Sequence, residues 1–196
     1  SKGDASLLVA DVSSVNKAGM AYDNDVVNPK RVSRWRKLVR SLAWVAKIFN
    51  KSSSFKPGEV SVEEEAGAEL MVLRQVQRCC FGKEINDLDL NGCVSDKSRL
   101  YSLLPILHAD GFVRIGGRIE NADVSFNEKH PIIVARCGAV DLLVQSLHEK
   151  LCHSGAATVL SELRRRGIWI LQGRRAIRSI LLACRRCHKF SAGSGC

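Results

Sequence analysis

Long apolar runs are missing from this sequence, and so is a signal peptide. A transmembrane helix needs about 18 or more consecutive apolar residues, and nothing in the 196-residue chain approaches that length. The N-terminus also lacks the charged and then apolar order of a secretory signal. We therefore expect a soluble, intracellular protein without a membrane partner.

Regular cysteine spacing is missing as well. Cys79 and Cys80 are adjacent, whereas Cys93, Cys137 and Cys196 stand alone. In a chain without a secretion signal, eight cysteines placed so irregularly indicate reduced thiols and one metal site, not a disulfide framework. This predicts a reducing compartment.

Nucleotide-binding motifs are also absent. Gly116 and Gly117 are adjacent, but neither a G-x-G-x-x-G nor a Walker pattern surrounds them. We interpret the pair as a backbone turn and expect no small-molecule substrate. The chain length suits one ordinary domain or two small ones. Because the chain starts with Ser1 and ends in a Gly-Ser-rich tail, we expect it to be a piece of a longer protein.

One cluster of metal-binding residue types is present. It consists of two histidines with four residues between them and a C-x-x-C pair thirty residues later: His148, His153, Cys184 and Cys187. This is the ligand set of a tetrahedral Cys2His2 zinc site. Four protein ligands leave no open position, so we expect one structural Zn²⁺.

Helix geometry is compatible with this assignment. A helix that begins near Val140 can end at His148, and a residue five positions later has rotated away from the same face. His153 must then lie just past the helix end, where Ser154-Gly155 is a typical stop. The cysteines follow an apolar-periodic segment that includes Ile177 and Ile180.

Two alternatives to this assignment remain. Cys152 or His188 could each replace a neighbouring ligand, although the spacing favours the four residues above. A nuclease or another enzyme with a catalytic zinc would need an open ligand position and a general base. Only Glu149 and Glu162 lie close enough in sequence for that role.

No acidic residue follows Glu162. The basic residues that follow it are Arg164, Arg165, Arg166, Arg174, Arg175, Arg178, Arg185, Arg186 and Lys189. A second acid-free basic block spans residues 30–51, and the formal net charge is +10. Two basic blocks around a balanced middle indicate a polyanion, and we expect the C-terminal cations to contact nucleic acid. The alternative is a solvated surface rich in arginine.

The element pattern predicts a mainly α fold with a small β unit (α+β). We expect a disordered segment at 1–29, and a basic amphipathic helix with its linker at 30–60. The apolar stripe of this helix is Trp35, Leu38, Val39, Leu42, Val45, Ala46 and Phe49. Docking of the stripe on neighbouring protein is the favoured interpretation, and a calmodulin-like or membrane-surface helix is the alternative.

A helical and β-hairpin extension is expected at 61–139. Ser61 and Glu64 form a capping box for a helix whose face continues through Leu70 and Gln77. A short helix can start at Ser95 or Asp96, and residues 112–115 and 131–134 have the composition of strands. The zinc-binding domain follows at 140–190, and 191–196 form a tail.

Six segments occur in a distinctive order. They are SRWRKLVRSLAWV (33–45), DGFVRIGGR (110–118), KHPII (129–133), the His148 and His153-Ser-Gly segment, WILQGR (169–174) and the C-x-x-C pair. Together they resemble the polyprotein of BEL/Pao-type LTR retrotransposons, in the region that precedes and includes the zinc-binding N-terminal (HHCC) domain of integrase. The resemblance covers roughly residues 30 to 190.

The resemblance implies a small helical, helix-turn-helix-like zinc module that contacts the DNA of the element ends and assists multimerisation. It also implies that strand transfer belongs to a downstream Asp-Asp-Glu core, with which this module would associate and which these residues do not contain. We therefore expect no enzymatic activity from this chain alone, and a location in a cytoplasmic particle, the nucleus or both. The alternative is a domesticated or truncated element that acts as a protein–protein interaction module.

Overall fold

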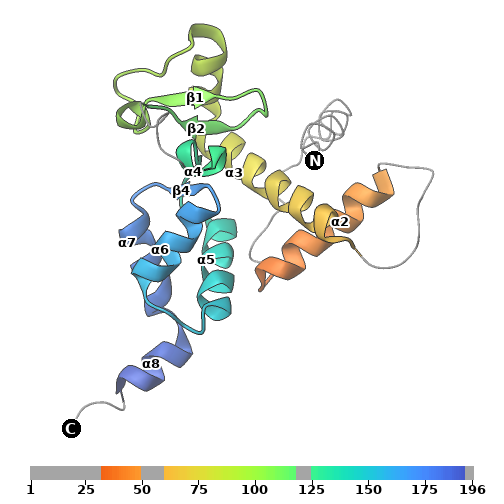
Figure 1. The fold of residues 1–196 in the computed structure, drawn as a ribbon, viewed down its shortest axis with the longest axis vertical. Coiled ribbons are helices and arrows are strands. Elements are labelled where there is room, and N and C mark those ends of the chain that lie inside the picture. The colour runs from red at the N-terminus through yellow and green to blue at the C-terminus, as the bar shows by residue number, and fades with distance from the viewer. Residues whose placement is uncertain (1–31, 50–59, 118–124, 193–196) are drawn as a thin grey trace. The chain divides into compact units, whose positions relative to one another are not determined.

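The computed structural model describes residues 32–49, 60–117 and 125–192, and these are mostly helical with one small sheet (Figure 1). The predicted α+β class is confirmed at this level. The predicted disordered segment 1–29 and most of the linker and tail lie outside the described residues. The chain divides into two compact units, Ser1–Leu73 and Arg74–Cys196. None of the described helices is long and apolar enough to cross a membrane.

The first unit contains α2 (Trp35–Phe49), which matches the predicted amphipathic helix. Trp35 and Leu38 are among its buried residues, as the apolar stripe predicts, while the side chain of Phe49 is not described. Lys47 on the basic side of α2 forms an ion pair of 3.1 Å with Glu64. Part of the positive charge of this block is therefore neutralised within the unit.

Helix α3 (Val62–Asn91) starts at the predicted capping box and continues into the second unit. The Ser61 amide donates to the Glu64 carboxylate at 2.8 Å, and the Glu64 amide donates to the Ser61 hydroxyl at 3.2 Å. The predicted face is confirmed at Gln77 but wrong at Leu70, which is 42% exposed. The buried face also includes Val72 and Val76. A kink at Phe81 (φ −133°, ψ 23°) interrupts the helix.

The second unit contains a four-stranded sheet in the order β1-β2-β3-β4. The strands are β1 (Pro105–Leu107), β2 (Val113–Ile115), β3 (Ile132–Val134) and β4 (Ile168–Ile170). The first two pairings are antiparallel, whereas β3 and β4 are parallel, with Ile132 opposite Ile168. The strand predictions at 112–115 and 131–134 agree with β2 and β3. The prediction of a hairpin is incomplete, because the sheet also contains β1 next to β2 and β4 next to β3.

The short helix expected after Ser95 is a turn followed by the 3₁₀ helix η1 (Tyr101–Leu103). It ends at Leu104, whose backbone is left-handed (φ 47°), and Pro105 then begins β1. Proline cannot donate the amide hydrogen bond that would continue a helix, which explains the early stop.

A buried glutamine connects α3 to the two central strands. Gln77 is 1% exposed, and its side-chain amide donates to the carbonyls of Val113 (2.7 Å) and Ile133 (2.6 Å). Its side-chain oxygen accepts from the Val113 amide at 2.9 Å. The side chain thus takes the place of backbone partners between β2 and β3, and we call this arrangement the Gln77 bridge.

An arginine in β2 is buried by a second polar network. Arg114 donates to the Asp110 carboxylate at 2.7 Å and to the His130 carbonyl at 2.7 Å. It also donates to Asn127 in α4 (Phe126–Lys129) at 3.2 Å. The DGFVR and KHPII segments therefore meet in one network that supports the sheet.

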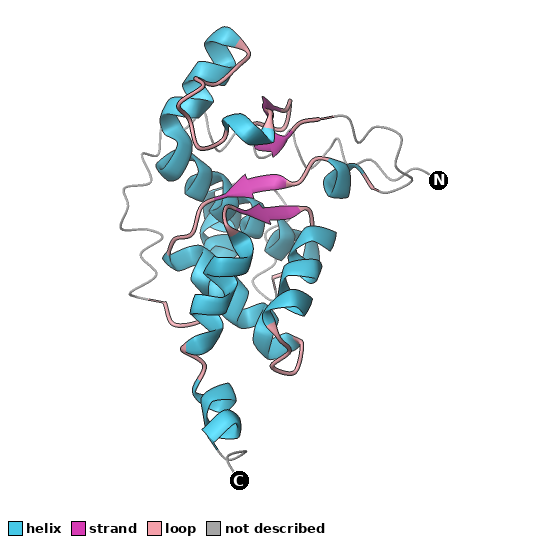
Figure 2. Cartoon of the chain, turned by 90° about the vertical axis from the view of Figure 1, so that its left-hand side faces the viewer, coloured by secondary structure: helices cyan, strands magenta, loops and turns pink. Residues whose placement is uncertain are grey.

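Four helices complete the second unit. They are α5 (Gly138–Lys150), α6 (Ala156–Arg165), α7 (Gly173–Leu182) and α8 (Arg185–Ala192). Helix α7 packs against both α5 and α6. Figures 1 and 2 show α8 at the end of this unit, beyond the other three helices. Strand β4 lies between α6 and α7 in the chain and pairs with β3. The sheet is therefore connected directly to this group of helices.

Candidate metal centre

His148 and His153 are brought together where α5 ends. His148 lies in the last turn of the helix and is 3% exposed. The chain then reverses through left-handed backbone at Cys152 (φ 52°) and His153 (φ 62°), and the His153 amide donates to the His148 carbonyl at 2.8 Å. The helix runs to Lys150, two residues past the predicted end at His148. The predicted stop at Ser154-Gly155 is wrong, since the left-handed backbone lies at Cys152 and His153 and Gly155 is extended.

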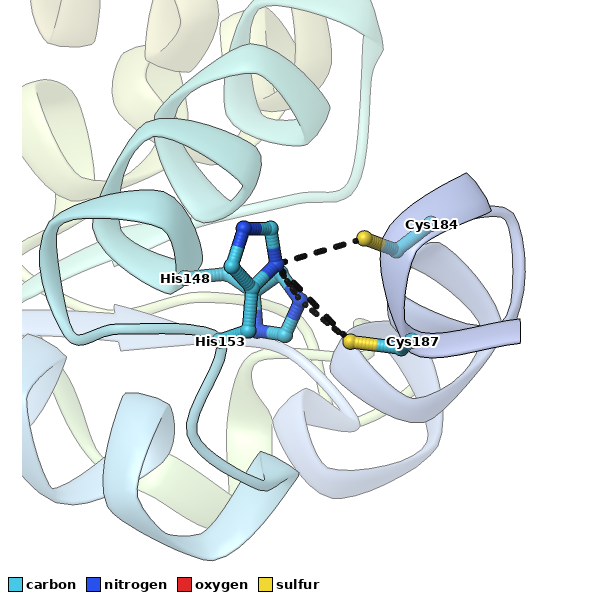
Figure 3. Close-up of side chains that lie close together, drawn as sticks. All are labelled: His148, His153, Cys184 and Cys187. Carbon is cyan, nitrogen blue, oxygen red and sulfur yellow. Dashed lines mark hydrogen bonds between the residues drawn. The ribbon is translucent and has the colours of Figure 1, made fainter. Parts of the chain in front are cut away.

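The two cysteines lie where α7 gives way to α8. Cys184 follows the end of α7, and Cys187 is in the first turn of α8. The His188 amide donates to the Cys184 carbonyl at 3.0 Å, which sets the turn between the two thiols. A C-x-x-C pair at a helix start can direct both sulfur atoms to one side, as Figure 3 shows.

The four predicted ligand residues converge. One donor atom from each of His148, His153, Cys184 and Cys187 lies within 4.8 Å of the other three (Figure 3). His153 Nδ1 is 3.1 Å from His148 Nε2 and 3.4 Å from Cys184 Sγ. Cys187 Sγ is 3.2 Å from His148 Nε2 and 3.8 Å from His153 Nδ1. These residues could therefore hold one metal ion.

Four of the six distances between the ligand atoms are close to those of a tetrahedral zinc site. Bonds of about 2.0–2.1 Å to nitrogen and about 2.3 Å to sulfur place the ligand atoms about 3.3 Å apart for two nitrogens and about 3.6 Å apart for nitrogen and sulfur. The nitrogen–nitrogen distance here is 3.1 Å, and the nitrogen–sulfur distances are 3.2, 3.4 and 3.8 Å. The spread is small enough for a metal ion to be held by minor side-chain adjustment.

A backbone carbonyl orients the buried histidine. Nδ1 of His148 lies 2.9 Å from the carbonyl oxygen of Ser154. Because a carbonyl only accepts, Nδ1 carries the proton, and the lone pair of Nε2 points at the other ligands. Metal-binding histidines typically have such a partner, which fixes the ring and its tautomer.

The two thiols have different proton affinities. The Cys187 amide hydrogen bond lowers the pKa of Cys184 to about 6. Desolvation and the neighbouring Cys184 raise the pKa of Cys187. One thiolate therefore forms readily near neutral pH, and a bound cation would favour the second.

The alternative ligands and bases occupy other positions. Cys152 and His188 do not belong to the converging group. Hydrogen bonds from Arg165 and Arg166 lower the pKa of Glu162 to about 2, so its carboxylate is a weak base. Glu149 is exposed and borders a hollow beside the metal centre.

Five of the cations predicted to contact nucleic acid line two hollows. Arg164, Arg174 and Arg175 line a hollow of about 560 Å³ at the start of α7. Arg185 and Arg186 line the hollow beside the metal centre. All five side chains belong to exposed residues.

Two other predicted cations are partly neutralised. Arg165 and Arg166 each lie 2.9 Å from the Glu162 carboxylate. Arg178 is exposed on α7, and the side chain of Lys189 in α8 is not described.

Sequence reasoning assigned no ligand-orienting or nucleic-acid-contacting role to two groups at these sites. One is the Ser154 carbonyl, which no side-chain pattern could reveal. The other is Trp169, whose ring lies 4.8 Å from the Arg164 guanidinium and which borders the Arg174 hollow. An aromatic residue inside an acid-free arginine run is a signal of nucleic-acid contact that the sequence does contain.

Comparison of the chain with family models, with curated proteins and with solved structures gives no match in any of the three. Function must therefore be inferred from the residues and their geometry.

Proposed function

We propose that this chain is a zinc-stabilised, nucleic-acid-binding and assembly module of a retrotransposon integrase. The observation that carries the proposal is the convergence of two imidazole and two thiol donors, together with a hollow lined by Arg164, Arg174 and Arg175 that contains no acidic residue. The six segments that resemble BEL/Pao polyproteins support the same assignment. Strand-transfer chemistry would belong to a catalytic core outside these residues.

Zinc is the metal that this donor set favours. Two nitrogen and two sulfur ligands in a tetrahedral arrangement are typical of structural Zn²⁺. All four ligands would come from the protein, so the metal would hold α5, the end of α7 and the start of α8 together. Its ligands bind in their deprotonated forms, and acid would therefore weaken binding.

Nucleic acid is the partner that the charge distribution favours. Arg164, Arg174 and Arg175 share a hollow whose lining contains no acidic residue. Phosphate contacts release counterions, which gives a log-log slope against salt of about −0.9 per phosphate contacted. Titration of the zinc-loaded chain with fluorescent duplex DNA at several salt concentrations tests this. Affinity that is absent, or unchanged between about 50 and 200 mM salt, contradicts the proposal.

A protein–protein interaction module of a domesticated or truncated element is the second candidate. Leu182, at the end of α7 and next to the ligand segment, is 79% exposed, which favours contact with another protein surface. Sedimentation with and without zinc would show whether the chain associates with itself. Association without any DNA affinity would favour this candidate.

A further inference from the structure

Two hollows share one stacked pair of side chains. The first, of about 560 Å³, is the hollow at the start of α7, and we call it the cationic hollow. The second, of about 270 Å³, lies between η1, β2 and α4, and we call it the apolar hollow. Arg164 and Trp169 line both of them. The guanidinium of Arg164 is 4.8 Å from the centre of the Trp169 ring.

The cationic hollow carries positive charge without an internal counterion. Arg174 and Arg175 form no ion pair among the described residues, and Arg164 contacts the face of Trp169. The nearest acidic residue in sequence, Glu162, is already held by Arg165 and Arg166. Three guanidinium groups around one hollow are suited to phosphate oxygens.

The apolar hollow has a different lining. Leu103, Leu104 and Pro131 form its apolar walls, and Leu104 is 63% exposed. Glu128 and Lys129 also border it, so besides Arg164 its lining carries one acidic and one basic side chain. A planar ring inserted between these walls would contact Trp169.

Trp169 is held in place by the sheet. It lies in the middle of β4, paired with Ile133 of β3. Gly173 lets α6 approach closely, since a Cβ there would meet the Leu160 side chain at 3.1 Å. A platform on a strand presents a preorganised surface and requires little ordering on binding.

We propose that the Arg164–Trp169 pair is a platform for an unpaired nucleotide, with the phosphates in the cationic hollow and the base in the apolar hollow against Trp169. This inference rests on the proposed nucleic-acid-binding function. A duplex keeps its bases stacked inside, whereas a single strand or a frayed end can place a base on an aromatic ring. The combination of guanidinium groups, an indole and an apolar hollow therefore favours unpaired over fully paired nucleic acid.

The test uses the full zinc-loaded chain labelled with 5-fluorotryptophan. Fluorescence anisotropy compares a blunt duplex with the same duplex carrying a short overhang, and fluorine NMR follows the signal of Trp169. We expect the overhang to bind at least about fivefold more tightly, since a stacked base contributes about 1–3 kcal/mol. Only the Trp169 signal should shift on adding the overhang, and Trp44→Phe assigns a signal from the other unit.

Two variants make the test specific. Trp169→Leu should abolish the preference for the overhang, with zinc content as the check on folding. Leu104→Asn changes the wall of the apolar hollow at a left-handed position that asparagine tolerates. It should reduce the preference for the overhang even if Trp169→Leu fails to fold.

The outcomes separate this inference from the function on which it rests. Equal affinity for blunt and overhang duplexes with an unmoved Trp169 signal overturns the platform and leaves the proposed function intact. Failure to bind any nucleic acid contradicts the proposed function itself. A polyglutamate peptide that shifts the Trp169 signal as the overhang does would instead assign the hollows to an acidic peptide, which also overturns the platform.

Discussion

The sheet region, residues 74–135, and the C-terminal helical region, residues 138–188, treat their polar groups in opposite ways. In the sheet region, the side-chain amide group of Gln77 forms hydrogen bonds with three backbone groups. Arg114 donates hydrogen bonds to the Asp110 carboxylate. In the C-terminal region, four atoms that could bind a metal ion converge, and several arginines form no ion pair among the described residues. In the first region these two buried side chains find their partners within the protein, whereas the second region offers groups that suit a cation and a polyanion.

The largest expected effect is the loss of a metal ligand. Cys184→Ser removes a thiolate from a site whose zinc would contribute about 10–16 kcal/mol of apparent binding energy in a small module. We expect loss of bound zinc and of amide exchange protection in residues 138–188, measured by metal analysis and hydrogen exchange. Cys152→Ser is the matched control, because this nearby thiol is exposed and outside the converging group. Equal zinc content in both variants would show that the site is misassigned.

The next largest effect should come from the Gln77 bridge. Gln77→Leu keeps the size of the side chain but leaves the Val113 amide and two buried carbonyls without partners. Unsatisfied buried groups of this kind cost about 1–3 kcal/mol each, so we expect the free energy of unfolding to fall by about 3 kcal/mol or more.

Urea unfolding measures this loss, and zinc binding should persist in the variant. Gln77→Glu sharpens the test, because a carboxylate can accept from the Val113 amide but cannot donate to the carbonyls. Gln145→Ala, at an exposed glutamine, is the control. A similar small change in all three variants would mean that the bridge does not stabilise the sheet.

A smaller effect should appear in the pH dependence of stability. Burial alone would raise the pKa of Asp110, but hydrogen bonds from Arg114 and from the Phe112 amide lower it overall. A lowered folded-state pKa stabilises the protein above the unfolded-state value of about 3.9, and this contribution disappears as the pH falls through the folded-state pKa. Asp110→Asn should therefore cost on the order of 1 kcal/mol at neutral pH, and the difference from the parent should shrink in acid.

Urea midpoints of the two proteins at matched pH values provide the measurement. Acid release of zinc affects both proteins alike, so the comparison isolates Asp110. A difference that stays constant from pH 7 to strongly acidic solution would contradict the assigned role of the Arg114 ion pair.

The smallest effect should separate free from neutralised arginines. Arg174→Gln removes a cation of the cationic hollow, so the slope of log affinity against log salt should become less steep by about 0.9. Arg165→Gln should change it less, because Arg165 is paired with Glu162 at 2.9 Å. Identical slopes for the two variants would mean that the phosphates do not bind preferentially in the cationic hollow.

The ligand set could be predicted from sequence because metal chemistry restricts both residue type and spacing. His148 and His153 flank a helix end, and the structure places their nitrogens 3.1 Å apart. The position of the helix stop could not be predicted as reliably. Glycine is the usual left-handed residue, but here Cys152 and His153 take that conformation, which turns His153 back toward His148.

The strand pairing and buried contacts around the site are harder to predict from the sequence. Strands of three residues, such as β4, are too short to show an alternating pattern, and β4 forms through its partner β3. Gln77 looks like one polar residue on a helix face, and only the tertiary structure reveals that it meets Val113 and Ile133. Residue type restricts the metal centre strongly, whereas strand pairing depends on contacts distant in the chain.

The parallel pairing of β3 with β4 has a consequence for the order in which the chain folds. His148 and His153 can approach each other as soon as α5 forms, but Cys184 and Cys187 lie beyond β4 in the sequence. Pairing of Ile132 with Ile168 closes a long loop, and non-local contacts of this kind form slowly. We expect this step to bring the two halves of the ligand set together, so that metal capture follows strand pairing and makes the late contact difficult to reverse.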